Sequence, residues 1–366
     1  MRVLLVDLER TWRGGQSQAL LLLRGLEARG HAAELVGSGG GVLAERAQTA
    51  GIAVHRTPAN SRRWGATLLV RRLLREQRFD VIHANEAHAL TAAWLARAHR
   101  HAPLVVARRV TFPLSRGALS MARYRAASCI VAISQAVRGQ LLAAHLDPQR
   151  IAVVADGVEV PPLVTAEQRS SARQRWSFSP EDRVLALVAP FTAEKGHALL
   201  LDAFAELRRQ APHCRLLLAG DGPLRSQIEE QARAAHLVPD VRFAGFVEEI
   251  DCVYAACDVF LFPSLSEGSG TSLLSAMAHA LPVAALARGG VAEIVEDGAN
   301  GLLVQEASPP ALAAATARLL ADREFARKLG EAARETVAAK YSADRMVEAT
   351  LAVFEGLISA RSPSAH

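Results

Sequence analysis

A glycine- and serine-rich segment in the second half of the chain carries the residues best suited to bind a phosphorylated ligand. The segment runs from Pro263 to Ser275, follows the apolar run 258–262, and leads into an Ala/Leu-rich helix. A helix N-terminus has free N–H groups and a partial positive charge that favour phosphate, and glycines let the backbone come close to it. Glu267 would repel phosphate, so its carboxylate is expected to face sugar hydroxyls. The pattern indicates a sugar joined to a diphosphate, and an ordinary strand–loop–helix turn is the alternative.

Lys195 is a second candidate, and it is one of only three lysines in the chain. It precedes Gly196 and follows the apolar run 184–188. An ammonium held at a strand end can contact a phosphate, and a charge-assisted contact of this kind is worth roughly 1.5–3 kcal/mol. A solvated lysine at the start of a helix is the alternative.

The first half has its own candidates at predicted strand ends. Gly14 and Gly15 form a glycine turn after the first apolar run, but the GxGxxG fingerprint is missing, so no dinucleotide site is predicted. Arg108 and Arg109 follow the run 104–107. Because one of two adjacent arginines at a strand end must point inward, the pair suggests an anion.

Further turns and two histidines complete the set. The turns Gly220–Pro223 and Gly245–Val247 follow apolar runs at the same predicted sheet edge as Lys195, where they would line a base-binding pocket or serve as plain turns. His83 and His88 are five residues apart with no evident third ligand, so no metal site is predicted.

Short apolar runs alternate with helical patterns, which predicts α/β architecture with two parallel sheets. Two Rossmann-like domains are expected, at residues 1–165 and 166–345, facing each other across a cleft at the carboxyl ends of their strands. Pro161, Pro162 and the polar stretch to Pro180 are interpreted as a linker. The helix over residues 344–359, with the tail forming a unit from 346 to 366, has a buried apolar stripe and is expected to cross back to the first domain. Strands are predicted at residues 3–6, 33–36, 81–83, 104–107, 130–133, 151–154, 184–188, 215–219, 241–243, 259–262 and 282–285.

Composition restricts the class of protein. The 366 residues are half apolar, enough for two domains with full cores. No apolar stretch reaches the length of a membrane span, and the first residues form a strand rather than a signal peptide. The four cysteines fit neither zinc nor a disulfide framework, which favours buried free thiols in a reducing cytosol.

Charge is distributed unevenly along the chain. Residues 1–165 hold 22 arginines, no lysine and 11 acids, while residues 166–366 hold 20 basic residues and 26 acids. The basic half suits an anionic membrane surface, a phosphorylated substrate or nucleic acid, but the chain lacks a nucleic-acid-binding module. Within it, a basic amphipathic stretch either rests on anionic lipid or packs its leucines into the core. This stretch contains Arg62, Arg63, Trp64, Leu68, Leu69, Arg71, Arg72 and Leu73.

Together these motifs resemble the retaining GT-B glycosyltransferases of family 4. The resemblance covers nearly the whole chain and is strongest from Val184 to Val304. It is carried by Glu194–Gly196, Gly220–Pro223, Gly245–Val247, Asp258–Ser264, Glu267–Gly270, Gly289–Val295 and Asp297–Gly301, and in the first half by Asp80–His83, Ala132–Ser134 and Asp156–Val158.

The resemblance implies metal-independent transfer of a sugar from a nucleotide-diphosphate donor, with no cofactor. Lys195 would hold the diphosphate, and Glu267 would bind sugar hydroxyls. Arg109 would stabilise charge as the third catalytic residue. The remaining donor-binding residues would be Gly14, Gly15, Phe246, Val247, Gly268, Ser269, Gly270, Thr271 and Ser275.

Three positions depart from the family pattern. Ser275 stands where a second glutamate normally binds the ribose, Phe191 lies where an arginine often precedes the lysine, and Arg109 lies where a histidine is frequent.

The expected protein is a cytoplasmic enzyme of cell-envelope glycan assembly, peripheral to the membrane, with a glycan or lipid-linked, anionic acceptor. The departures motivate an alternative, a GT-B scaffold that binds nucleotide or glycan without transfer. A sugar-nucleotide epimerase would need a different set of carboxylates and histidines.

Overall fold

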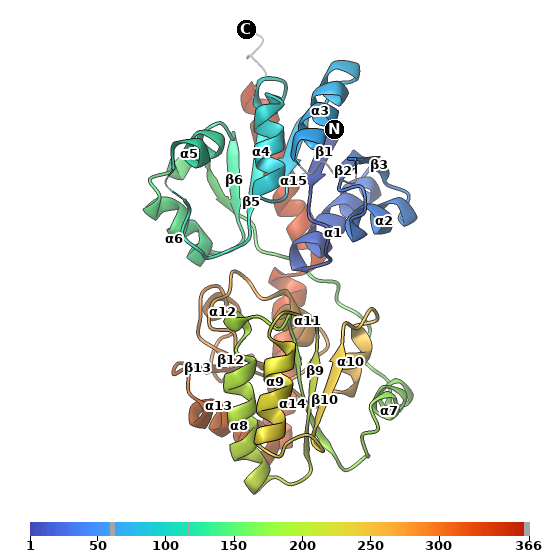
Figure 1. The fold of residues 1–366 in the computed structure, drawn as a ribbon, viewed down its shortest axis with the longest axis vertical. Helices are drawn as coiled ribbons and strands as arrows, with labels where there is room; N and C mark the ends of the chain where they lie inside the picture. Colours follow the sequence, from blue (N-terminus) through green and yellow to red (C-terminus); the bar gives the residue numbers. More distant parts are fainter. Residues whose placement is uncertain (59–62, 116, 362–366) are drawn as a thin grey trace. The chain divides into compact units, whose positions relative to one another are not determined.

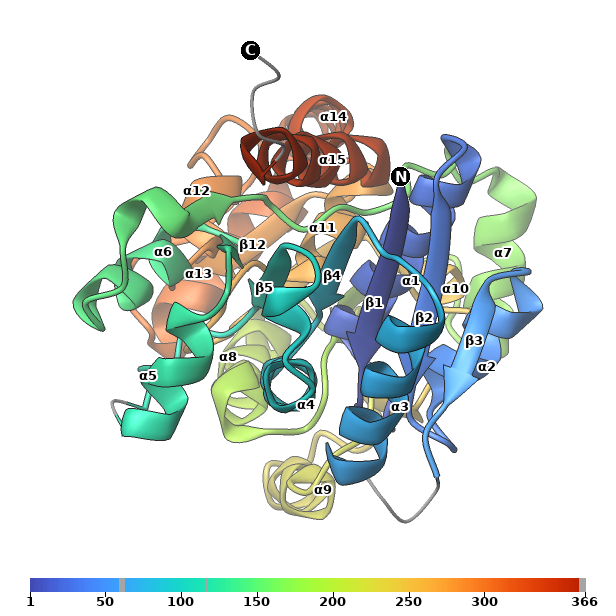
Figure 2. The same cartoon turned by 90° about the horizontal axis from the view of Figure 1, so that it is seen from above.

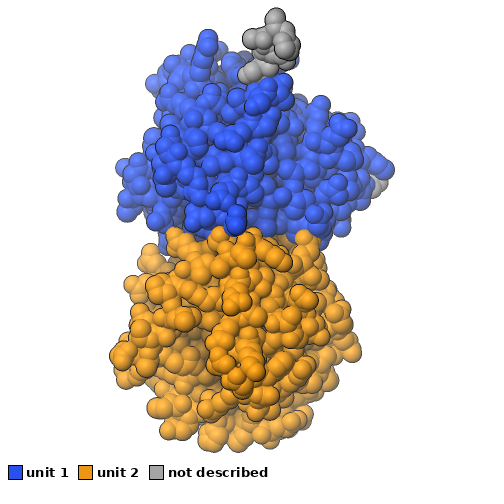
Figure 3. Space-filling view, turned by 180° about the vertical axis from the view of Figure 1, so that it is seen from behind, with its two compact units in different colours: residues 1–157, 343–366 blue, residues 158–342 orange. Residues whose placement is uncertain are grey.

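The computed structural model describes residues 1–58, 63–115 and 117–361, and these form two compact units (Figure 3). Unit 1 contains residues 1–157 and 343–366, and unit 2 contains residues 158–342. The last helix therefore belongs to the same unit as the first 157 residues. This confirms the expectation that it crosses back to the first domain.

Unit 1 is built on a parallel sheet that has seven strands among the described residues, in the order β3-β2-β1-β4-β5-β6-β7 (Figure 1). Its strands are β1 (Arg2–Asp7), β2 (Ala32–Gly37), β3 (Ala53–Arg56), β4 (Val81–Ala84), β5 (Leu104–Arg108), β6 (Cys129–Ala132) and β7 (Ile151–Val153). Its α-helices are α1 (Gly14–Ala28), α2 (Val42–Thr49), α3 (Arg63–Glu76), α4 (Ala87–Leu95), α5 (Ala118–Arg125), α6 (Gln135–Ala143) and α15 (Ala343–Arg361).

Helices cover both faces of this sheet. Successive residues of a strand point to opposite faces, and in the buried strands the residues on both faces are apolar. Val3 and Leu5 of β1 pack with α1, α2 and α15, whereas Leu4 and Val6 pack with α3, α4, α5 and α6 (Figure 2). Helix α15 lies so close to α1 that a Cβ on Gly25 would overlap the side chain of Val347.

Unit 2 repeats this plan with a parallel sheet in the order β10-β9-β8-β11-β12-β13. Its strands are β8 (Arg183–Val188), β9 (Cys214–Ala219), β10 (Val241–Gly245), β11 (Val259–Phe262), β12 (Val283–Leu286) and β13 (Leu302–Val304). Its α-helices are α7 (Ala166–Arg175), α8 (His197–Gln210), α9 (Arg225–Ala234), α10 (Asp251–Ala256), α11 (Thr271–Ala278), α12 (Val291–Ile294), α13 (Pro309–Ala321) and α14 (Arg323–Lys340).

The sequence interpretation of residues 161–180 as a linker is wrong, because helix α7 lies within them. The helix begins at Thr165 with a capping box that satisfies its first N–H groups. Arg169 and Arg173 of this helix each hold one oxygen of Asp258 at 2.5 Å. The segment is therefore an integral part of unit 2.

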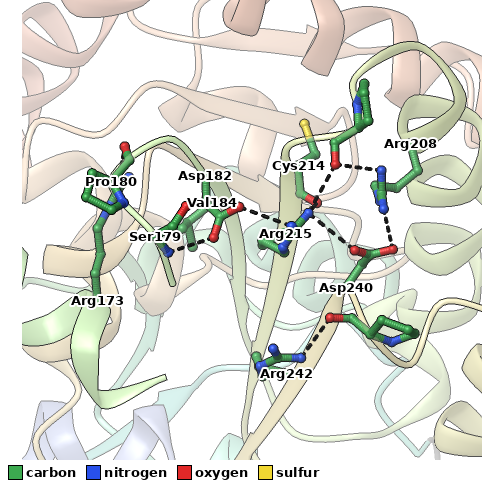
Figure 4. Close-up of polar contacts among 12 residues, drawn as sticks. Arg173, Ser179, Pro180, Asp182, Val184, Arg208, Cys214, Arg215, Asp240 and Arg242 are labelled. Carbon is green, nitrogen blue, oxygen red and sulfur yellow. Dashed lines mark hydrogen bonds and ion pairs between the residues drawn. The ribbon is translucent and has the colours of Figure 1, made fainter. Parts of the chain in front are cut away.

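Aspartates and arginines hold the amino-terminal edge of this second sheet (Figure 4). Arg215 of β9 lies 3.2 Å from both Asp182, just before β8, and Asp240, just before β10. Arg208 pairs with the other oxygen of Asp240 at 2.6 Å. These ion pairs fix the strand starts, at the edge opposite to the candidate site.

The cysteines partly follow expectation. Cys129, Cys214 and Cys257 are buried free thiols, but Cys252 is only half-buried. Among the described residues, no helix is long and apolar enough to cross a membrane.

Candidate functional site

The strand order brings the candidate residues to the point where each sheet changes its direction of winding. In unit 2 this point lies between β8 and β11, and in unit 1 it lies between β1 and β4. Helices on either side of such a point diverge and leave room for ligands outside the carboxyl ends of the strands. Lys195 follows β8 and Glu267 follows β11, so both belong to this edge of unit 2.

Lys195 and Glu267 are in direct contact. Lys195 Nζ lies 2.6 Å from Glu267 Oε2, and both side chains are largely buried. Lys195 is the last residue of a short 3-10 helix (Ala193–Lys195) that ends at Gly196, whose φ is 70°. A Cβ on Gly196 would overlap the carbonyl oxygen of Pro263, so a glycine lets these two loops touch.

The loop that carries Glu267 is fixed from two sides. Leu265 N donates to the carbonyl of Glu194 at 2.8 Å, and Gly290 N donates to the carbonyl of Glu267 at 3.1 Å. Gly289 has a φ of 56°, and a Cβ there would overlap the Glu267 carbonyl oxygen. The carboxylate therefore projects from a backbone whose position is set by both neighbouring loops.

The start of α11 completes this group. Its N-cap is Gly270, with a φ of 95°, and its first turn contains no acidic residue. The N–H groups of Gly268, Ser269, Gly270 and Thr271 donate to no acceptor within the described residues. The hydroxyl of Ser264 is also buried without a partner there. Unpaired donors beside a lysine make this corner suitable for a phosphate.

Ser275 lies one helical turn further along α11, half-buried. Tyr254 of α10 lies near Ser275 and donates to the carbonyl of Ser272 at 3.2 Å. Burial raises the pKa of the Tyr254 hydroxyl, which therefore stays protonated. Position 275 thus offers a neutral hydroxyl where the family resemblance implies a carboxylate.

Two further expected residues follow β10. Phe246 is 61% exposed and Val247 is partly buried, directly after Gly245. Gly245 accepts a hydrogen bond from Gly220 N at 2.8 Å, so the turns after β9 and β10 are joined. An exposed aromatic ring at this edge is available for stacking on a planar ligand.

His197, at the start of α8, was not singled out from the sequence. Its ring stacks on Phe191 with centroids 4.2 Å apart, and its Nδ1 is buried with no partner among the residues that the structure describes. Burial and the charge of Lys195 lower the pKa of His197 to about 4. It is therefore a neutral ring that supports the loop beneath Lys195.

Gly14, Gly15 and Arg109 lie in unit 1, at the carboxyl edge of its sheet. A Cβ on Gly15 would lie 3.4 Å from Cδ of Arg109, so these two residues are adjacent. Arg109 forms an ion pair with Asp156 and donates to Asn85 Oδ1 at 3.3 Å. Asn85 was not identified as a site residue from the sequence. It directly follows an apolar strand, and the same signal identified Arg109.

A possible metal-binding group, also missed, consists of Glu9, Glu86 and His88, whose ligand atoms lie within 4.8 Å of one another. The structure gives two of these three side chains other partners. Glu86 caps α4 by accepting from the N–H groups of His88 and Ala89, and burial raises its pKa to about 7. Arg63 donates to His88 Nδ1 at 3.0 Å. A cation would have to compete with the cap and with this arginine.

Family models match both halves of the chain. Residues 168–336 match the family described as Glycosyl transferases group 1, and residues 12–160 match Glycosyltransferase Family 4. Alpha-D-kanosaminyltransferase of Streptomyces kanamyceticus is 31% identical over 66% of this chain and 63% of its own length. Alpha-maltose-1-phosphate synthase of Mycolicibacterium smegmatis is 32% identical over 63% of each chain. The matched part thus spans less than two thirds of either relative.

A solved structure shares the fold over the full length. The crystal structure of Anabaena Alr3699/HepE in complex with UDP and glucose superposes with a TM-score of 0.84, covering 98% of this chain and 100% of the other, at 22% identity.

Proposed function

Because the chain belongs to family 4 of the glycosyltransferases and has their GT-B fold, we propose that it transfers a sugar from a nucleotide-diphosphate donor to an acceptor hydroxyl. The observation that carries this proposal is the Lys195–Glu267 contact beside the N–H groups of Gly268 to Thr271, which donate to no acceptor among the described residues. A cation, a carboxylate and a helix N-terminus together match the phosphates and the hydroxyls of such a donor.

In the proposed mechanism, donor binding separates the ion pair. The diphosphate replaces Glu267 as the partner of Lys195, and the carboxylate turns to the hydroxyls of the sugar. The N–H groups from Gly268 to Thr271 hold the phosphate attached to the sugar. These donors stabilise the negative charge that grows on the leaving diphosphate, which is the main source of rate enhancement in such a site.

The bond changes are those of a retaining transfer without a metal. The bond between the anomeric carbon and the phosphate oxygen breaks, and the acceptor oxygen bonds to the same face of that carbon. The released phosphate oxygen accepts the proton of the acceptor hydroxyl, so the protein need not supply a separate base. Phe246 would stack on the base, Val247 would contact it and Ser275 would bond the ribose.

The acceptor is proposed to be a cell-envelope glycan or a lipid-linked one, met at a membrane surface. Helix α3 supports this, because the leucines of the amphipathic stretch divide between two faces. Leu73 is buried and Leu69 packs against the core, but Trp64 and Leu68 are 70% and 66% exposed. Arg62 of this stretch lies outside the described residues.

Three arginines share the exposed face of α3 with Trp64 and Leu68. Arg71, Arg72 and Arg75 are exposed and fall at helical spacings of three, four and seven residues from Leu68. Arg72 pairs with Glu76, while Arg71 and Arg75 have no partner among the described residues. A tryptophan and a leucine beside unpaired cations fit the interface of an anionic bilayer.

Transfer can be tested directly with purified protein and UDP-, GDP- and ADP-sugars. Release of the nucleoside diphosphate and the proton NMR coupling of the new anomeric centre would report the donor and the stereochemistry. Thermal shift with UDP, GDP and ADP, with CMP as control, would report binding separately. Binding without turnover for every donor and acceptor offered would favour the alternative of a non-catalytic scaffold.

A further inference from the structure

A buried polar network joins the ends of three strands of unit 1 to the start of α1. Asn85, after β4, is at its centre and is 2% exposed. Its Nδ2 donates to Asp7 Oδ2 at 2.7 Å and to the carbonyl of Gly15 at 3.0 Å. Its Oδ1 accepts from Arg109 at 3.3 Å. One amide group thus contacts the ends of β1 and β5 and the first turn of α1.

The charge of Arg109 is matched inside unit 1. Arg109 pairs with Asp156, which is 4% exposed, and its Nε is buried with no partner among the described residues. Asp7 accepts from Gln16 at 2.9 Å as well as from Asn85. The guanidinium of Arg109 is therefore committed to a buried carboxylate rather than left available for an external anion.

The same contacts set the position of the Gly14–Gly15 turn. Gln18 holds α1 from its other side by exchanging two hydrogen bonds with the backbone of Gly157, at 2.7 and 2.8 Å. The carbonyl of Gly15 is held by Asn85, and the side chain of Arg109 packs against Gly15. The N–H groups of Gly14 and Gly15 donate to no acceptor in the described part of the chain.

We propose that Asn85 and the Arg109–Asp156 ion pair form a positioning device for the Gly14–Gly15 turn, and that Arg109 supplies no charge to the reacting atoms. The proposal rests on the proposed function, because the turn matters for transfer only if it contacts the donor. It gives Arg109 a different role from the catalytic one expected from its sequence. Asn85 suits the centre of the device because only an amide offers donors to Asp7 and Gly15 and an acceptor to Arg109.

Removing the ion pair in two steps separates the two roles of Arg109. Arg109→Met alone leaves Asp156 as an uncompensated buried charge, so the thermal midpoint is expected to fall by roughly 10 °C and transfer to fall with it. Adding Asp156→Asn removes that charge, so the midpoint is expected to recover while the turn stays loosened, and a positioning role predicts a donor KM about tenfold above the parent with kcat within about threefold. A double variant that regains the parental midpoint but has a kcat about a hundredfold below that of the parent would overturn the proposal.

Asn85→Ala provides a second readout, which does not depend on the double variant folding. The turn is loosened but Lys195 and Glu267 are untouched, so KM for the donor is expected to rise roughly tenfold while kcat stays within about threefold. Thr67→Val is the matched control: Thr67 is a buried hydroxyl of α3 that donates to the carbonyl of Arg63 at 2.9 Å. An unchanged donor KM in Asn85→Ala, or the same rise in Thr67→Val, would contradict the proposal.

The experiments distinguish a failure of the proposed function from a failure of the positioning proposal. If the parent protein transfers no sugar, the proposed function fails, and the thermal midpoints of the Arg109 and Asp156 variants still judge the ion pair. A midpoint that does not recover in the double variant would overturn the positioning device whether or not the parent is active.

Discussion

Lys195 and Glu267 form an ion pair, with Nζ 2.6 Å from Oε2, between loops that follow two neighbouring strands of unit 2. Each residue was assigned from the sequence to a different part of the donor, whereas in the structure the two side chains neutralise each other. Partly buried charges are costly unless paired. The contact therefore holds both side chains in place at the candidate site.

Lys195→Ala and Glu267→Ala are each expected to lower transfer by about a hundredfold or more, since each removes a group that is proposed to contact the donor. Each also leaves the other charge unpaired, so stability should fall by about 1–3 kcal/mol. Steady-state kinetics and urea unfolding would measure the two effects. Lys328→Ala, on the exposed face of α14, is the control and should change neither. Unchanged turnover in both site variants would rule out the proposed mechanism.

Ser275→Glu is expected to strengthen donor binding. A carboxylate makes charge-assisted hydrogen bonds to ribose hydroxyls, which are worth about 1 kcal/mol more than neutral ones, or roughly fivefold in Kd. Calorimetric titration with UDP and GDP would measure this. Ser275→Gln has the same length without the charge, so binding no tighter in Glu than in Gln would show that position 275 does not reach the ribose.

The sequence was sufficient to predict the residues at strand ends but not the contacts between them. Lys195 and Glu267 follow apolar runs long enough to be recognised as buried parallel strands. Two short strands were missed: β13 has three residues, and β3 has four that are only partly buried. Helix α7 was missed because it has no apolar stripe, and what holds it in place is the pair of arginines that contact Asp258.

The buried polar network was the least predictable part of the site. Asn85 contacts Asp7 across 78 residues of sequence, and Arg109 contacts Asp156 across 47. From sequence alone, a polar residue that follows a strand is interpreted as a solvated loop residue. The strand order is needed to show which other strand ends lie beside it. The adjacent arginines at positions 108 and 109 did indicate an inward-pointing charge, but the partner that the pattern suggested was a ligand rather than Asp156.

His83 is expected to make the protein sensitive to acid. It is fully buried in β4 against Phe354, with neither ring nitrogen paired among the described residues, and burial lowers its pKa to about 3. The unfolded chain binds this proton near pH 6.5, so the contribution of His83 is full above that pH. It is lost as pH falls toward 3, by up to about 5 kcal/mol.

His83→Leu should therefore flatten the loss of stability between pH 6.5 and 4. The comparison with the parent matters, because Glu86 has a raised pKa of about 7 and contributes the opposite slope between pH 4.5 and 7. Subtracting the two urea-unfolding profiles cancels Glu86 and leaves the term from His83. Parallel profiles would mean that His83 gains a proton in the folded protein as readily as in the unfolded chain.

Replacing Arg71, Arg72 and Arg75 together by Gln is expected to weaken binding to vesicles that contain anionic phosphatidylglycerol. Each arginine near such a surface contributes about 1 kcal/mol, so the triple variant should bind roughly a hundredfold more weakly at low salt. Trp64→Ser should weaken binding with little dependence on salt, because it removes apolar contact. Cosedimentation with the vesicles would measure both. A charge-matched control, Arg209, Arg233 and Arg327 to Gln, removes three exposed arginines from unit 2. If that control loses as much binding, net charge rather than the face of α3 accounts for the attraction.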